Sequence, residues 1–507
     1  MQSIPPAAVR ASRFPRWARN TLALMLLVAV TIGVPWCLIN AMGRHAWGET
    51  QALFKREGET LEFRALLSPV LPEERNFCAS PRLLGLAAPP GRPGPHAEEG
   101  RRNREAIERT SVERMGGAAP SGLRTGERFS VEQTTGKKSS HGGRVSAEQS
   151  EEAMRQMQEA VAKAEPLLAE LATRLDCSEA QWDPPLATVD LPEPLYLLTS
   201  GEDTSMGRLV TLLRRRAAIA CREGNARRAV ECVQMLLRLC KAEADKPLEY
   251  GTQYALGTAL DIVWQMSDER QGTMELWQLM EAELASCEVQ AWTLRSCRGA
   301  VAFEVELLLY GREHGLPDFA SFPRSAPTPL SRVLPDGIYL NNASAFAEVY
   351  LENVLRPLRS GTWADALRGC SEVERIVHEG EMHPWRNIST FWVRLEGRSH
   401  IDAVRGSAYR QSILNQALVA CALEQYRLAR GGYPESLLTL TLANGAPLPK
   451  DPIAGKPIGY RRVGEERYVL WCVGISGVDH GGTRSSRPQM YMSDGDWVWG
   501  FESGAGK

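Results

Sequence analysis

The sequence predicts a mainly α-helical protein with an N-terminal transmembrane helix, an exported domain of helical hairpins and a small α+β domain at the C-terminal end. Three observations lead to this fold class. The uncharged apolar segment 21–42 is long enough to cross a bilayer. Apolar residues then recur at helical spacing over most of residues 147–430. After Arg430 the pattern changes to glycines, prolines and short alternating stretches, which are typical of turns and strands.

Composition narrows the possible functions. The 507 residues carry a formal net charge of −2, so we expect no nucleic-acid partner, which would require a basic face. The eleven cysteines are scattered without a Cys-x-x-Cys pair, which argues against a zinc site and against a complete disulfide framework. Cys221, Cys232 and Cys240 fall on apolar helical positions, and we expect them to be small core residues.

The first residues set the expected topology. Residues 1–20 contain Arg10, Arg13, Arg16 and Arg19 and no acidic residue. By the positive-inside rule this tail stays in the cytoplasm and the chain after residue 42 is exported. We therefore expect a single-pass protein of the inner (cytoplasmic) membrane, with the bulk of the chain in the periplasm or outside.

Three other interpretations of the apolar segment compete with an uncleaved anchor. A cleaved signal peptide needs small residues before the cut, and the best candidate, Ile39-Asn40-Ala41, fits poorly. A lipoprotein signal also needs small residues before its cysteine, but Trp36 precedes Cys37. The processing motif of a pseudopilin leader is absent. An uncleaved anchor at 21–42 is the prediction.

The exported part divides by composition. Residues 43–86 form a juxtamembrane segment. Residues 87–146 are rich in Gly, Pro, Ser, Arg and Glu and nearly free of large apolar side chains, which predicts a flexible linker. Residues 147–405 are expected to form the α-helical domain, and residues 406–507 the C-terminal domain.

Several helices are predicted individually. An apolar stripe from Met154 to Leu175 predicts a helix kinked at Pro166. Residues 208–240 predict a hairpin that turns at Gly224-Asn225; it is similar to one tetratricopeptide unit, although no second copy follows at the period of about 34 residues. Further helices are expected over residues 342–355, ending before Pro357, and over 401–430.

The turn after the long helix is expected to organise the C-terminal domain. In "GGYPESLLTL" both Gly431 and Gly432 are predicted to take backbone angles that a Cβ disfavours. Tyr433 then folds back and is buried against the end of the helix and the strands. "ERYVLWCVGISG" alternates as a strand does, and "GDWVWGF" is its expected partner.

This succession resembles the globular end of the type II secretion major pseudopilin. The similar segments are "ALEQYRLARGGYPESL", "KDPIAGKPIGYR", "YVLWCVGISGVDHGG" and "SDGDWVW". The resemblance implies a helix-plus-sheet fold outside the cytoplasmic membrane. It does not imply pilus assembly, because a pilin carries its membrane helix directly before its sheet. More loosely, the rest of the chain resembles an uncharacterised bacterial family of membrane-anchored proteins with such an end.

The resemblance also implies a metal site, because major pseudopilins hold calcium in the loop before their last strand. In the matching loop Asp479, Asp494 and Asp496 could bind Ca²⁺, a cation that prefers oxygen ligands. However, Ser476 stands where these proteins usually have Asp, and Arg484 and Arg487 would oppose a cation. The alternative is an acidic turn whose aspartates cap backbone amides.

No catalytic set emerges from the sequence. In "HEGEMH" the histidines His378 and His383 are five residues apart, whereas the zincin motif needs a separation of four. We therefore predict a non-catalytic, membrane-anchored scaffold or interaction protein of the cell envelope, associated with a secretion or pilus-like system. Its expected partners are the cytoplasmic membrane and other envelope proteins. The alternative is an exported, membrane-anchored hydrolase whose site cannot be recognised from sequence.

Overall fold

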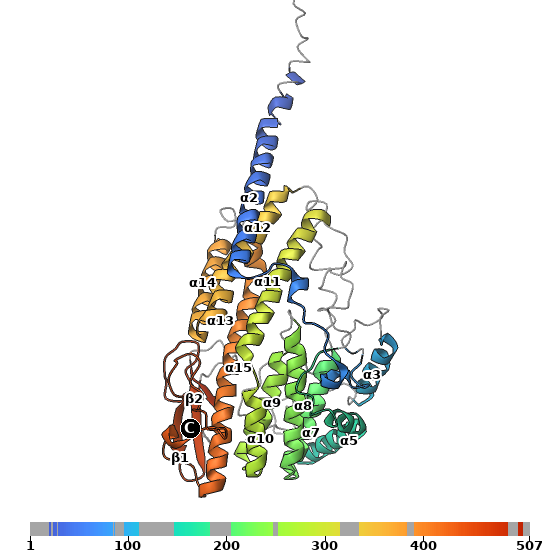
Figure 1. The fold of residues 1–507 in the computed structure, drawn as a ribbon, viewed down its shortest axis with the longest axis vertical. Helices are drawn as coiled ribbons and strands as arrows, with labels where there is room; N and C mark the ends of the chain where they lie inside the picture. Colours follow the sequence, from blue (N-terminus) through green and yellow to red (C-terminus); the bar gives the residue numbers. More distant parts are fainter. Residues whose placement is uncertain are drawn as a thin grey trace, which may run out of the picture.

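A computed structural model describes residues 20–21, 24–27, 29–84, 86, 96–110, 147–182, 204–246, 252–314, 334–382, 390–484 and 495–499. These residues are mainly helical, as predicted, with one small antiparallel sheet near the C-terminal end. The helices pack side by side into an elongated body. The apolar N-terminal helix leaves this body at one end and the sheet lies toward the other (Figure 1).

The longer helices after the apolar N-terminal helix follow one another along the chain. They are α3 (Ala97–Thr110), α5 (Ala147–Ala172), α7 (Thr204–Arg222), α8 (Ala226–Asp245), α9 (Thr252–Asp268), α10 (Met274–Ala285), α11 (Val289–His314), α12 (Asp336–Tyr350), α14 (Trp363–Met382) and α15 (Phe391–Arg430). The predicted hairpin is formed by α7 and α8. Gly224 turns the chain with a φ of 70°, and the Asn225 side chain accepts a hydrogen bond from the Arg228 amide at 3.1 Å to start α8.

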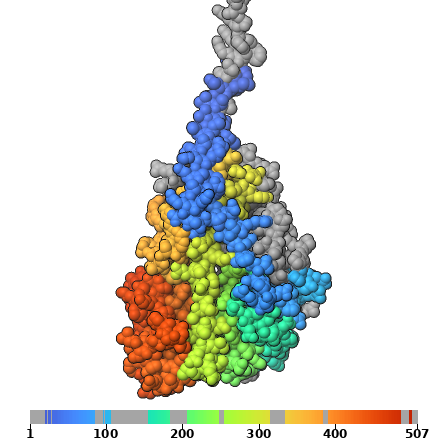
Figure 2. Space-filling view, viewed as in Figure 1, coloured from blue at the N-terminus to red at the C-terminus, as the bar shows by residue number. Residues whose placement is uncertain are grey.

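The N-terminal apolar helix is longer than the predicted span. A π-helical turn, η1 (Ala29–Gly33), leads into α2 (Val34–Glu57), and the helix counted from Leu24 to Glu57 is long and apolar enough to cross a membrane. Its upper part projects from the body, while its lower part lies on the body (Figure 2). In that lower part Gly43, Thr50 and Phe54 are buried, which marks one face of the helix as packed against protein.

Part of the predicted linker 87–146 is a helix. In α3 the Ile107 side chain is only 1% exposed, and Asn103 Nδ2 donates to the carbonyls of Pro81 and Leu84 at 2.8 and 3.1 Å. The linker prediction is wrong for this stretch, because one buried isoleucine and a hydrogen-bonding asparagine attach a polar helix that composition alone disfavours. Residues 111–146 lie outside the described part.

The helix predicted to end before Pro357 continues past it. α12 passes into a π-helical turn, η7 (Leu351–Leu355), and then into α13 (Arg356–Ser360), where Pro357 lies in the first turn. Proline lacks an amide donor and clashes with the carbonyl four residues earlier in an α-helix. The wider π turn moves that carbonyl, and Arg356 keeps helical backbone angles, so the helix continues through the proline.

Helix α15 crosses the predicted domain boundary at residue 406. It begins at Phe391, ten residues before the expected start, and runs for 40 residues. Its first half packs on α14, and its second half packs on α9, α10 and the sheet. One hydrophobic core extends from Phe54 to Trp499. The C-terminal α+β unit therefore shares a helix and a core with the helical hairpins.

The sheet follows the predicted strand pattern. β1 (Gly459–Val463), β2 (Arg467–Cys472) and β3 (Trp497–Trp499) form an antiparallel sheet in the order β1-β2-β3. The expected pairing of the last two strands is confirmed, with Trp471 opposite Val498. Gln416 of α15 donates to the carbonyl of Trp497 at 3.0 Å, which holds β3 on the helix.

All eleven cysteines are free thiols, and the expected core positions Cys221, Cys232 and Cys240 are buried. Burial raises the pKa of Cys221 to about 12 and that of Cys232 to about 11. Only Cys37, on the apolar part of α2, and Cys177 have appreciable exposure.

This distribution predicts a simple labelling pattern. A membrane-impermeant maleimide at neutral pH should label the folded protein, reconstituted in vesicles, at Cys177, because the buried thiols stay protonated and covered. Cys177→Ser should abolish the label, and unfolding should expose the remaining thiols. Rapid labelling of the folded Cys177→Ser variant would contradict the buried positions. Mass spectrometry of the intact chain gives the count.

Candidate functional site

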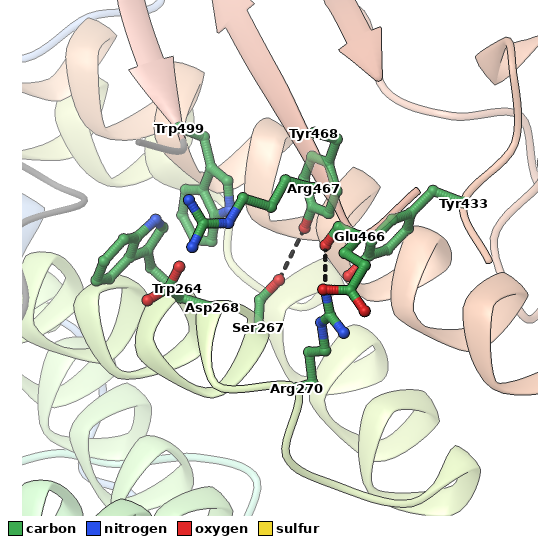
Figure 3. A pocket seen from close by; sticks show the side chains of 9 residues that line it. All are labelled: Trp264, Ser267, Asp268, Arg270, Tyr433, Glu466, Arg467, Tyr468 and Trp499. Carbon is green, nitrogen blue, oxygen red and sulfur yellow. Dashed lines mark hydrogen bonds and ion pairs between the residues drawn. The ribbon is translucent and has the colours of Figure 1, made fainter. Parts of the chain in front are cut away.

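A pocket of about 260 Å³ opens where the end of α9 meets the C-terminal unit. Its walls come from α9, from the turn after α15 and from β2 and β3 (Figure 3). The lining residues are Trp264, Ser267, Asp268, Arg270, Tyr433, Glu466, Arg467, Tyr468 and Trp499. We call this pocket the seam pocket, because it lies between the helical hairpins and the sheet.

A buried carboxylate lies beneath the seam pocket. Glu424 of α15 is fully buried, and one of its oxygens, Oε1, accepts hydrogen bonds from the Tyr433 hydroxyl at 2.6 Å and the Ser267 hydroxyl at 3.1 Å. Its other oxygen accepts from Arg427 Nε at 2.8 Å. A buried charge is costly unless it is paired and hydrogen-bonded, and these three donors meet that requirement.

The hydroxyl groups around Glu424 form a directed chain. Ser267 has one hydrogen, which it donates to Glu424, so the Tyr468 hydroxyl donates to Ser267 Oγ at 2.8 Å. Burial, and next the Glu424 charge, raise the pKa of Tyr433 and of Tyr468. Both phenols therefore stay protonated near neutral pH and act as donors that hold α9, α15 and β2 together.

The rim of the seam pocket carries charge. Arg270 Nη2 donates to the carbonyl of Glu466 at 2.7 Å and lies 3.1 Å from its carboxylate. The Arg467 side chain is exposed and extends toward the pocket beside Trp499, and its backbone pairs with β1 in the sheet (Figure 3). A guanidinium offers a planar set of donors to carboxylate or phosphate. In this pocket the two guanidinium groups are balanced by two carboxylates, those of Asp268 and Glu466, and Arg270 is already paired with Glu466.

The Tyr-Pro turn largely matches its prediction. Gly431 ends α15 in the left-handed region with a φ of 83°. Gly432 is not among the glycines with positive φ, so that half of the expectation is wrong. Tyr433 is 4% exposed, and its ring meets that of Tyr468 edge-on with centroids 4.8 Å apart. The predicted burial of Tyr433 against helix and strands is confirmed.

The predicted calcium residues are described only in part. Asp479 accepts hydrogen bonds from the Gly481 amide at 2.8 Å and the Trp471 indole at 2.9 Å, and the amide lowers the pKa of this carboxyl. Asp496 accepts from the amides of His480 and Gly482, at 3.1 and 2.7 Å. Both carboxylates therefore cap backbone amides.

Asp494 lies outside the described residues, as do Arg487 and His383. Over the ranges that the structure does describe, no group of three or more His, Cys, Asp or Glu side chains could hold a metal ion. His378 is exposed on α14, with its imidazole facing Glu381. Calcium binding stays a prediction that depends on Asp494.

Apart from Tyr433, the residues that build the seam pocket were not predicted from the sequence. Glu424 carried the one usable signal, because it falls on the same helical face as Ala417, Ala420 and Cys421, all of them buried. A carboxylate on an apolar stripe indicates a buried partner. Nothing in the sequence placed that partner at Ser267, which lies 157 residues away.

The chain was also compared with known proteins. No family model, no curated protein and no solved structure matches it.

Proposed function

We propose that this chain is a non-catalytic, membrane-anchored scaffold or interaction protein of the bacterial cell envelope. The observation that carries the proposal is α2. Its upper part is an apolar helix exposed on all sides, whereas its lower part is built into the body. A span joined to its body in this way sets the distance and direction at which the body stands from the membrane.

The contacts of α2 support an anchor that is retained. Asn40 Oδ1 accepts a hydrogen bond from the Gly337 amide at 2.8 Å, in the first turn of α12. Gly43 packs so tightly on the same turn that a Cβ there would lie 2.4 Å from Gly337 Cα. At its far end Glu57 pairs with Arg356 at 3.0 Å. Cleavage after Ala41 would remove Asn40, and with it the cap of α12.

The seam pocket supports binding in preference to hydrolysis. The Ser267 hydroxyl donates to Glu424, whose two oxygens are already taken up by Tyr433 and Arg427. A nucleophilic serine needs a base that is free to take its proton. We extend the proposal to the finer resemblances, a pseudopilin-like C-terminal unit and a tetratricopeptide-like hairpin of α7 and α8, and to association with a secretion or pilus-like system.

Topology provides the test of this proposal. A reporter that is active only after export, fused after Lys507, should be active, and the protein should sediment with the cytoplasmic membrane. Replacing Arg10, Arg13, Arg16 and Arg19 together with Glu should reduce reporter activity, because the positive-inside signal is reversed. A wild-type fusion that is active only in the cytoplasm, or a chain found in the soluble fraction, would refute the proposal.

A further inference from the structure

Three large apolar side chains are exposed where α14 ends and α15 begins. Met382 is 64% exposed, and Phe391 and Leu395 are each 49% exposed. Phe391 and Leu395 lie one helical turn apart on α15. Arg394, on the same turn, donates to the carbonyl of Gly380 at 2.7 Å, which joins the end of α14 to the start of α15. We call Met382, Phe391 and Leu395 the apolar corner.

The apolar corner lies close to the level at which the anchor leaves the body. The Trp392 amide donates to Asn342 Oδ1 of α12 at 3.1 Å. Asn342 is five residues after Gly337, the residue that contacts Asn40 and Gly43 of α2. At the rise of an α-helix this separation is about 8 Å along α12.

The packing of α2 on α12 shows on which side of Gly337 the residue Asn342 lies along the axis of α2. The two helices run side by side in the same direction, because Gly43 meets Gly337 and Thr50 Oγ1 donates to Glu348. The uncharged part of α2 ends at Gly43, before Arg44. A bilayer adds roughly 5–8 Å of headgroup region on each side of its hydrocarbon core. The start of α15 therefore falls at about the outer edge of the headgroup region when α2 spans the membrane, and helical side chains such as Phe391 and Leu395 lean toward the N-terminus of α15, which is the membrane side.

We propose that the apolar corner inserts into the interfacial layer of the membrane that α2 crosses, so that the body contacts the phospholipid surface at a second point. This inference rests on the proposed membrane anchoring. The chemistry of the corner fits that layer, because the Arg394 guanidinium lies 5.4 Å from the centroid of the Phe391 ring. Aromatic rings and long cationic side chains together favour the boundary between acyl chains and headgroups.

Photo-crosslinking of the full chain tests this contact. A benzophenone amino acid is placed singly at Phe391 or Leu395, and the protein is reconstituted in vesicles of phosphatidylethanolamine and phosphatidylglycerol. Leu38, 57% exposed on α2, is the positive control, and Leu438, 91% exposed next to the sheet, is the matched negative control. After irradiation we expect phospholipid adducts, identified by mass, at Phe391, Leu395 and Leu38. We expect no adduct at Leu438.

The outcomes separate this inference from the proposed function. Adducts at Leu38 without adducts at Phe391 and Leu395 would overturn the apolar corner and leave the anchor standing. Absence of adducts at Leu38 would overturn membrane anchoring itself. A yield of phospholipid adducts at Leu438 equal to that at Phe391 and Leu395 would mean that the whole surface touches lipid without preference, and would also overturn the proposal. In native membranes, crosslinks from Leu395 to a protein in place of lipid would assign the corner to a protein partner and refute it.

Discussion

Replacing Tyr433 with alanine is expected to lower the free energy of unfolding of the full chain by about 3–5 kcal/mol, the usual cost of truncating a buried aromatic side chain. The ring packs edge-on against Tyr468, so its removal leaves a cavity between α15 and β2. The same change deprives the buried Glu424 of its shortest hydrogen bond. Denaturant unfolding in detergent, followed by circular dichroism, measures the effect.

A second variant separates the contribution of the hydroxyl from that of the ring, and a third serves as a control. Tyr433→Phe keeps the ring and removes only the hydroxyl donor, and we expect it to cost about 1–3 kcal/mol, because the acceptor that loses its partner is buried and charged. Leu438→Ala alters a side chain that is 91% exposed, and we expect it to stay within about 0.5 kcal/mol of the parent. Unchanged stability of Tyr433→Ala would mean that the turn does not pack as described.

The full chain is needed for this measurement. The second half of α15 is buried against α9 and α10 as well as against the sheet. An isolated fragment of residues 406–507 would expose that face of α15. The melting temperature of the fragment would then depend on these lost contacts as much as on Tyr433.

The Gly337→Leu substitution is expected to detach the lower part of α2 from the body. A Cβ at Gly337 would lie 2.0 Å from the carbonyl oxygen of Ile39 and 2.8 Å from Asn40 Cα. Both are backbone atoms, so no side-chain rotation relieves the clash and the helices must separate. We expect a loss of about 3 kcal/mol, the upper end for overpacking.

Limited proteolysis of reconstituted protein follows this separation. In the variant, residues 43–57 should become accessible and be cut faster than in the parent, while the rest of the body stays protected. Gly48→Ala is the matched control, because a Cβ there meets nothing within 4 Å, and it should leave cleavage unchanged or slower. A Gly337→Leu protein with parental cleavage rates would show that α2 does not pack on α12.

Elements with a strong local pattern could be predicted from the sequence. The apolar N-terminal helix, the hairpin at Gly224 and the strand pair each depend on periodicity or on a turn residue a few positions away. The burial of Tyr433 was also predictable, because Gly431 lets the helix end in the left-handed conformation and Pro434 restricts the backbone of Tyr433 to extended angles.

The parts that were not predicted depend on residues far apart in the chain. The buried side chain of Ile107 holds α3 on the body, although the composition of this segment is polar and does not predict a packed helix. Pro357 marks a helix end by local rules, yet the π turn before it lets the helix continue. The contact of Gly43 with Gly337 and that of Glu424 with Ser267 each join separate helices. A single sequence carries no periodic signal for such pairs.

The length of α15 has a mechanical consequence. At about 1.5 Å per residue its 40 residues span about 60 Å, and it runs lengthwise along the body (Figure 1). The second half of α15 holds β3 through Gln416. The start of α15 is joined to α12 through Trp392. A force applied to the sheet would act on one continuous helix and reach α12, on which α2 packs. Tension at the sheet end of the body would thus be transmitted to the apolar N-terminal helix.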